Sequence, residues 1–147
     1  MKILIDADGC PVVKLATNLG KEHGLEVRVF ADTAHIMKSD YAKVVVVDKG
    51  KDAVDFELIK HVAPDDIVVT SDYGLASMAL TKGAHAIGFG GLVFTQHNID
   101  ALLGARYAQQ TLRRLGERTR GSKPRIPKVD RNFRDAFKRI CTEVAKV

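Results

Sequence analysis

The chain has 147 residues and a mass of 16.1 kDa, with 46% hydrophobic and 28% charged residues, which fits one globular domain and excludes disordered and fibrous classes. Its net charge of +5 is unevenly divided, because residues 1–105 hold 10 Lys/Arg and 14 Asp/Glu, whereas residues 106–147 hold 13 and 4. Apolar runs stay far below the ~20 residues of a membrane span, and two distant cysteines suggest neither disulfides nor a zinc site, so we expect a cytoplasmic protein without a membrane anchor.

Short runs rich in Val, Ile and Leu, most of them bounded by Gly or Asp, predict five buried β-strands. They cover residues 2–6, 25–30, 43–48, 66–71 and 84–89. Helical signals lie between them: one helix follows Pro11, which we place at its first position, and two more cover residues 52–62 and 73–82. Residues 31–39 fit a loop or a short helix. The alternation predicts an α/β fold with an open, mostly parallel sheet of about five strands and helices on both faces.

Two more helices are expected after the sheet. Asn98 is expected to cap a helix that reaches about Leu115, and Asp130 to open the last helix. In that last helix an apolar stripe recurs at helical spacing and is expected to dock on the core: Phe133, Phe137, Ile140 and Val144. We therefore expect one domain over residues 1–147, with a basic helical region over about residues 106–147.

Six aspartates fall at or just after the carboxyl ends of predicted strands: Asp6, Asp8, Asp48, Asp52, Asp55 and Asp72. These ends share one edge of a parallel sheet, and open α/β sheets bind ligands at that edge where the strand order reverses. Asp55 is the most informative, because Ile59 and Val62 follow it on the stripe of the helix that faces the sheet. Asp48 and Asp52 also fit ordinary roles at the end of a strand and the start of a helix.

Clustered carboxylates repel one another unless a cation lies among them. An all-oxygen donor set suits Mg²⁺ or Mn²⁺, and such ions can polarise a phosphodiester and generate hydroxide from water. The candidate metal ligands are Asp6, Asp8, Asp52, Asp55 and Asp72. Of these we expect Asp6, Asp8, Asp55 and Asp72 to be catalytic.

The dense positive charge after residue 105 is typical of proteins that bind a polyanion, although solvated helices can carry similar charge. A module that binds nucleic acid without chemistry is therefore one alternative. Its phosphate contacts would come from Arg113, Arg114, Arg118, Arg120, Lys123, Arg125, Lys128 and Arg131. With no Trp and 6% aromatic residues, we expect few surfaces on which single-stranded bases could stack.

Four segments together resemble the uncharacterised YaiI/YqxD family, which is regarded as PIN-like: Asp6-Ala7-Asp8-Gly9-Cys10-Pro11, Asp52-Ala53-Val54-Asp55, Thr70-Ser71-Asp72-Tyr73-Gly74-Leu75-Ala76 and Gly121-Ser122-Lys123-Pro124. The resemblance covers essentially the whole chain. It implies a Mg²⁺- or Mn²⁺-dependent nuclease, acting on RNA more than on DNA. By position it makes Asp6 or Asp8, Asp52 or Asp55, and Asp72 the metal ligands, with Thr70 or Ser71 beside them as nucleic-acid contacts. PIN nucleases usually carry a further acid after the position of Asp72; residues 73–82 contain none, so one or two ions stay open.

A second alternative comes from the first strand, which also resembles the Asp-x-Asp-Gly opening of haloacid-dehalogenase-type phosphatases. There Asp6 would attack phosphorus and Asp8 would act as general acid and base. The later motifs of that class fit this chain poorly, because neither Ser nor Thr closes the third predicted strand.

Overall fold

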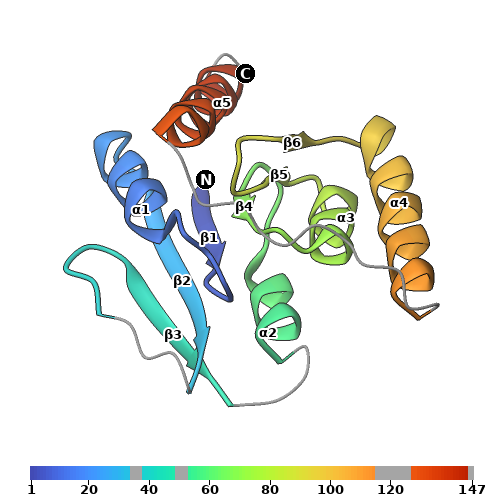
Figure 1. Ribbon diagram of the computed structural model, residues 1–147. Coiled ribbons are helices and arrows are strands. Elements are labelled where there is room, and N and C mark those ends of the chain that lie inside the picture. Colours follow the sequence, from blue (N-terminus) through green and yellow to red (C-terminus); the bar gives the residue numbers. More distant parts are fainter. Residues whose placement is uncertain (34–37, 49–52, 115–126, 146–147) are drawn as a thin grey trace.

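A computed structural model describes residues 1–33, 38–48, 53–114 and 127–145 of the chain (Figure 1). The elements follow in the order β1 (Lys2–Asp6), α1 (Val13–Glu22), β2 (Glu26–Asp32), β3 (Lys43–Val47), α2 (Ala53–His61), β4 (Ile67–Val69), α3 (Tyr73–Thr81), β5 (His85–Ile87), β6 (Val93–Phe94), α4 (Gln96–Arg114) and α5 (Pro127–Ala145).

The strands form one sheet in the order β3-β2-β1-β4-β5-β6. Neighbouring strands from β3 to β5 pair in parallel, whereas β6 pairs antiparallel with β5. The chain therefore builds outwards from β1 to β3 and then crosses over to start again at β4, so the strand order reverses between β1 and β4. The predicted α/β fold and mostly parallel sheet are confirmed. The sixth strand was not predicted, because a two-residue strand is too short to show alternation.

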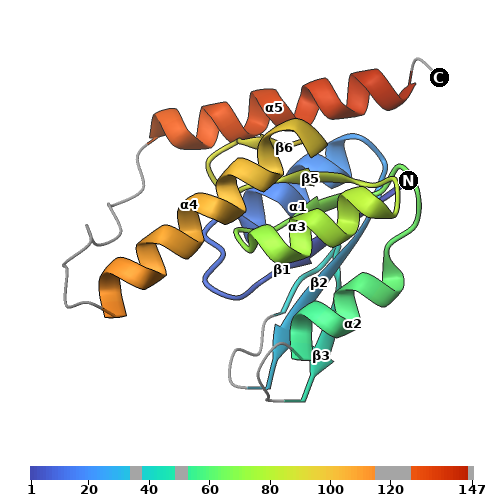
Figure 2. The same cartoon turned by 90° about the vertical axis from the view of Figure 1, so that its right-hand side faces the viewer.

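Helices cover both faces of the sheet, α1 and α5 on one side and α2, α3 and α4 on the other (Figures 1 and 2). Successive residues of β1 point to opposite faces, and the core divides accordingly. Ile3 and Ile5 belong to the cluster under α1 and α5, whereas Leu4 belongs to the cluster that contains Leu58 of α2 and Leu75 of α3. Because both faces are covered, the strands read as continuous apolar runs.

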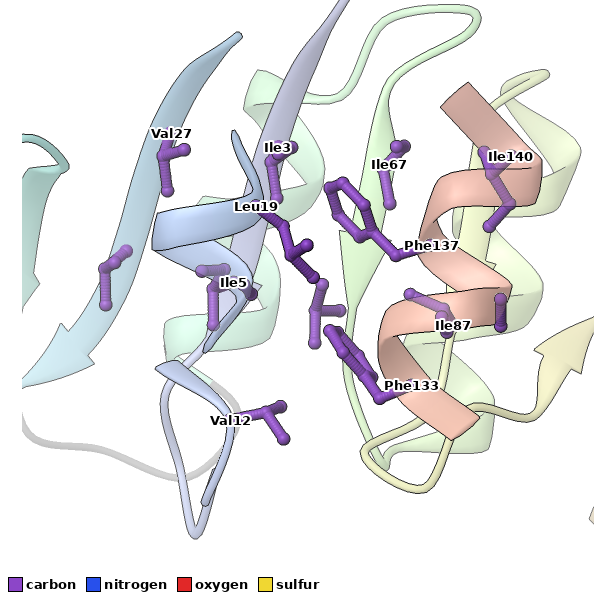
Figure 3. Packing of buried hydrophobic residues seen from close by; sticks show 14 of the residues in the cluster. Ile3, Ile5, Val12, Leu19, Val27, Ile67, Ile87, Phe133, Phe137 and Ile140 are labelled. Atoms are coloured by element: carbon purple, nitrogen blue, oxygen red, sulfur yellow. The ribbon is translucent and has the colours of Figure 1, made fainter. Parts of the chain in front are cut away.

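Helix α5 is seated on the sheet by its aromatic side chains. Phe133 and Phe137 are fully buried, and Figure 3 shows Phe137 between Leu19 of α1 and the sheet residue Ile67, with Phe133 beside Ile87. The α5 backbone also lies against Gly91, where a Cβ atom would come within 2.7 Å of the carbonyl carbon of Asn132. The predicted docking stripe is thus confirmed, and the basic C-terminal helix shares the core of the sheet.

Three helix starts differ from the sequence interpretation. Pro11 lies in the turn before α1, which begins two residues later at Val13, because a Gly-containing turn separates β1 from the helix. Asn98 is not the residue before α4; it exchanges hydrogen bonds with Thr95, whose Oγ1 accepts from the Asn98 N–H at 3.1 Å and whose N–H donates to Asn98 Oδ1 at 2.9 Å. The last helix begins at Pro127, a favoured first residue, and not at Asp130.

Candidate active site

Asp6 stands at the point where the strand order reverses. It is the last residue of β1 and is only 5% exposed. Its Oδ2 accepts a hydrogen bond from the Thr70 hydroxyl at 2.9 Å, and its Oδ1 accepts one from the backbone N–H of Asp8 at 3.2 Å. Thr70 directly follows β4, the strand that pairs with β1 on the crossover side. The Asp6–Thr70 bond therefore spans the place where open α/β sheets bind ligands.

Thr70 and Asp72 link the end of β4 to the start of α3. The Thr70 side chain is fully buried, and its Oγ1 accepts the Asp72 N–H at 3.0 Å while it donates to Asp6. Asp72 is the N-cap of α3, where its Oδ1 accepts the N–H of Leu75 at 3.1 Å. Thr70 thus holds the Asp6 carboxylate and the start of the α3 cap in one fixed arrangement.

Asp8 lies in a tight turn just beyond β1. The backbone of Gly9 has a φ of +61°, which most L-residues adopt only with strain, and the Cys10 N–H donates to the Ala7 carbonyl at 3.2 Å. This turn leaves Asp8 exposed while its N–H reaches back to Asp6. One carboxylate is therefore buried and the other faces solvent.

Asp6 and Asp8 carry negative charge that no described Lys or Arg offsets by an ion pair. Burial raises the pKa of Asp6, and the charges of Asp8 and Asp72 raise it further, although hydrogen bonds from the Thr70 hydroxyl and the Asp8 N–H oppose this rise. Within the described ranges, no Lys, Arg or His forms an ion pair with Asp6 or Asp8. Asp66 at the opposite end of β4 is also buried, yet Lys2 Nζ lies 2.6 Å from its Oδ2. Of the two buried acids, Asp66 therefore has a cationic partner, whereas Asp6 has none among the described residues.

The raised pKa of Asp6 predicts how stability depends on pH. Between its ordinary value near 3.8 and its raised value, the folded chain binds this proton more tightly than the unfolded chain, so the Asp6 contribution to the free energy of unfolding falls as pH rises through that window. At pH 7 in EDTA we expect Asp6→Asn to raise Tm by a few degrees, since ~1 kcal/mol corresponds to roughly 2–4 °C at this size. The gain should shrink as pH falls towards 3.8. Thermal melts of both proteins from pH 4 to pH 8 check this, and a constant difference would contradict it.

The other predicted acids are distributed more widely. Asp55 is partly buried in the first turn of α2, as expected from its stripe, whereas Asp48 is exposed after β3, two strands away from β1. Asp52 lies outside the described residues. Among the described residues, no group of three His, Cys, Asp or Glu side chains is already arranged to hold a metal ion. The structure brings Asp6, Asp8 and Asp72 together, and the donors are of the oxygen type that Mg²⁺ and Mn²⁺ prefer.

Asp32 is a nearby acid that the sequence analysis missed. It ends β2, the strand that lies directly beside β1, and it is partly buried. The sequence predicts that this strand ends at Phe30 and that residues 31–39 form a loop or a short helix. The alternation of Val27, Val29 and Ala31 continues to the end of the strand and contains the signal that would have placed Asp32 at the same edge.

The predicted nucleic-acid contacts fall into three groups. Ser71 is exposed beside Asp72, whereas Thr70 is buried and bonded to Asp6. Lys128 and Arg131 are exposed on α5. The backbones of Arg113 and Arg114 belong to α4, but their side chains are outside the description, as are Arg118, Arg120, Lys123 and Arg125 altogether. Figure 2 shows that α4 ends and α5 begins towards the side of the sheet where β1 ends.

Comparison with known proteins decides the family. Residues 4–143 match the family described as the uncharacterised YaiI/YqxD family. The chain belongs to this family. Curated UPF0178 proteins are similar over nearly their whole length: one from Exiguobacterium sibiricum is 48% identical over 97% of this chain and 98% of its own, and one from Lachnoclostridium phytofermentans is 41% identical over 99% of both. No solved structure matches the chain.

The resemblance read from the four sequence segments is thereby confirmed, and the fold of this YaiI/YqxD member agrees with the PIN-like expectation. No described helix combines the length and apolar character needed to cross a membrane. The family description assigns no reaction, so chemistry must be argued from the site of this chain.

Proposed function

We propose that this YaiI/YqxD protein binds Mg²⁺ or Mn²⁺ at the carboxyl ends of β1 and β4 and hydrolyses phosphodiester bonds of nucleic acid, RNA more than DNA. The observation that carries the proposal is Asp6, a buried carboxylate at the strand-order reversal whose pKa is raised by burial and by two further acids. A bound cation would relieve the repulsion among these carboxylates, and this relief would favour binding of the ion. The preference for RNA and the cytoplasmic location rest on the PIN-like resemblance and the cysteine pattern.

Each residue has a distinct role in this proposal. Asp6 and Asp72 would hold the ion from two neighbouring segments, and Thr70 is a positioning residue that fixes the Asp6 carboxylate. Asp8 is exposed and within reach of substrate, and its side chain would turn towards the ion on binding. A bound Mg²⁺ or Mn²⁺ supplies a Lewis acid for the phosphodiester and lowers the pKa of a water molecule. Asp55 completes the proposed catalytic set from α2, with Asp52 as a further proposed ligand.

The exposed side of α5 supports a polyanionic substrate. Five cationic side chains are exposed there: Lys128, Arg131, Arg134, Lys138 and Arg139. Within the described part of the chain none of them forms an ion pair, although Asp135 and Glu143 share the helix. Helix α5 begins towards the side of the sheet where β1 ends (Figure 2), and in this proposal its first turns would hold phosphates of the substrate.

The proposal predicts that Mn²⁺ stabilises the fold through the acidic site. At 100 times its dissociation constant, an ion that binds only the folded state adds ~2.7 kcal/mol, or roughly 5–10 °C in Tm at this size. We expect Asp72→Asn to lose most of this rise, since it removes one ligand while Asn remains a good N-cap. Thermal melts with and without Mn²⁺ measure both effects.

Asp100→Asn is the matched control, because Asp100 is exposed on α4, the helix that follows β6 at the edge of the sheet, three strands from β1. It should respond to Mn²⁺ as the parent does. A parent Tm that ignores Mn²⁺ up to millimolar concentration would rule out the metal site.

The exposed cations of α5 also favour a second candidate function, nucleic-acid binding without hydrolysis. Such a protein would bind with a steep salt dependence and without any requirement for Mn²⁺. Binding measured in EDTA across a salt series, beside the Mn²⁺ melts, separates the two functions.

A further inference from the structure

His61 links helix α2 to the sheet through hydrogen bonds whose directions are fixed by its partners. Its Nδ1 lies 2.9 Å from Nη1 of Arg28 on β2, and its Nε2 lies 3.2 Å from Oε1 of Glu57, one turn earlier in α2. The ring also packs on Phe30 of β2, with the ring centroids 5.0 Å apart. A guanidinium only donates hydrogen bonds, and an ionised carboxylate only accepts them. His61 Nδ1 is therefore the acceptor and Nε2 carries the proton, so this bridge requires a neutral imidazole.

Protonation of His61 would change the two hydrogen bonds in opposite ways. An imidazolium carries an N–H on both ring nitrogens, so a positive ring would turn Nδ1–H towards the Arg28 guanidinium. The pKa of Glu57 is lowered, chiefly by its hydrogen bond with His61, so this carboxylate stays charged and attracts the imidazolium. Because Glu57 belongs to α2 itself, protonation strengthens a contact within the helix and removes the contact with the sheet.

Helix α2 runs from the carboxyl end of β3 back towards the start of β4, so His61 lies among the charged groups near the start of the neighbouring strands. Glu26 of β2 is bound to Arg28, and Lys60 shares Glu57 with the ring at 3.6 Å. The further charged or titratable groups near this end of α2, among the described residues, are Lys2 on β1 with its partner Asp66, Lys43 on β3 beside Arg28, Lys82 after α3, and Asp65 with His85 at 4.0 Å. Glu57 is thus the acid positioned to bind a protonated ring.

Helix α2 has few other attachments to the rest of the domain. Leu58 is its fully buried residue, and Lys82 Nζ donates to the carbonyl of Ile59 at 2.7 Å. An element with few buried apolar contacts belongs to the less stable parts of a fold. Asp55, which the proposed function places in the catalytic set, precedes Leu58 by three residues in the same helix. A change in how the last turn is held therefore acts on the helix that carries Asp55.

We propose that His61 is a pH-sensitive link, which holds α2 on the sheet while its imidazole is neutral and releases the last turn when it is protonated. Imidazole is the side chain that ordinarily changes charge between pH 5 and 8, and the His61 ring is partly exposed to solvent. The effect on the metal site rests on the proposed function: release of α2 weakens metal binding through Asp55. Acid also affects Asp6, whose pKa is raised, so variants of His61 are needed to separate the two effects.

The first test is ¹⁵N NMR of the histidine rings at pH 7.5 in EDTA, which distinguishes the two neutral tautomers. We expect His61 to carry its proton on Nε2. His23 is the internal control, because its Nδ1 lies 2.8 Å from the carbonyl oxygen of Leu19, an acceptor, and it should carry its proton on Nδ1. A proton on Nδ1 of His61 would overturn the inference.

The second test is hydrogen exchange of the α2 amides in EDTA, expressed relative to free amides at the same pH. In the parent we expect protection to fall roughly 10-fold between pH 7.5 and pH 5.5, the effect of losing one hydrogen bond to a charged group. His61→Gln should keep its protection at both pH values, because an amide can accept from Arg28 and donate to Glu57 but takes up no proton. His23→Gln, just after α1, is the matched control and should respond as the parent does. Equal falls in the parent and His61→Gln would contradict the link.

The coupling to the metal site is measured by Mn²⁺ titrations of Tm at the same two pH values. Acid should weaken Mn²⁺ binding less in His61→Gln than in the parent, and an equal change in both proteins would overturn the coupling through Asp55. A parent that ignores Mn²⁺ at either pH would contradict the proposed function instead. The His61 link would still be decided by the NMR and exchange measurements, which contain no metal.

Discussion

Asp6→Asn is expected to lower Mn²⁺-dependent cleavage of a single-stranded RNA by at least about 100-fold, since a bound metal contributes several kcal/mol to such reactions. We propose Asp6 as the central ligand, because its carboxylate accepts hydrogen bonds from Thr70 and Asp8 and is repelled by the charge of Asp72. The substitution keeps the shape of the side chain but removes its charge. Cleavage rates at saturating Mn²⁺, followed on denaturing gels, measure the loss.

Misfolding cannot account for such a loss if the pH prediction holds, because Asp6→Asn is expected to melt at a higher temperature than the parent in EDTA. Asp100→Asn serves again as the control and should cleave at the parental rate. Parental cleavage by Asp6→Asn would remove this residue from the site.

The same variant separates nuclease from phosphatase chemistry. If the parent hydrolyses a generic aryl phosphate with Mg²⁺ and leaves RNA intact, and Asp6→Asn loses that turnover, then the haloacid-dehalogenase reading of Asp6 and Asp8 replaces the nuclease proposal. Cleavage of RNA by the parent in the absence of aryl phosphate turnover supports the nuclease.

Phe137→Ala is expected to reduce the free energy of unfolding by about 3–5 kcal/mol, the range for truncating a buried Phe, which corresponds to roughly 10 °C in Tm. Phe137 is fully buried in α5 and packs against Phe133 and the ring of His23 beside α1. The cavity would open between the two helices and the sheet (Figure 3). Urea unfolding and thermal melts measure the loss.

Phe56→Ala is the matched truncation of an exposed Phe and should change the free energy of unfolding by less than about 0.5 kcal/mol. Phe137→Leu, which keeps most of the volume, should lose less than Phe137→Ala and covers the case in which the alanine variant does not fold. A loss below about 1 kcal/mol in Phe137→Ala would mean that the basic C-terminal helix is an appendage and not a part of the domain.

Much of the fold was predictable, because its strands are buried on both faces and read as continuous apolar runs. The first strand and helix α3 match their predicted ranges to within one residue. The predicted starts of α1 and α4 were wrong. The turn at Gly9, with its positive φ, delays the start of α1, and the hydrogen-bonded Thr95–Asn98 pair sets the start of α4. Strand β6 was not predicted, because it is defined by its pairing with β5 and not by a sequence pattern of its own.

The candidate site was predictable in part. Asp6 and Asp72 were placed correctly at the carboxyl edge, because each follows a recognisable strand. Asp6 is buried and Asp8 is exposed because of the turn that follows β1. The geometry of this turn cannot be read from the periodicity of the sequence. Expecting few stacking surfaces was reasonable from 6% aromatic residues, yet the position of Phe56 on α2 leaves one ring in solvent.

The amino-acid sequence by itself determined the α/β alternation, the acids that follow the strands and the charge of the C-terminal region, since these depend on residue order and local periodicity. Tertiary structure decided the rest. The strand order brought Thr70 to Asp6, 64 positions apart, and left Asp48 at the end of β3, two strands away from β1. Those distances depend on which strands pair, and pairing is set by long-range packing of the two core clusters on the faces of the sheet.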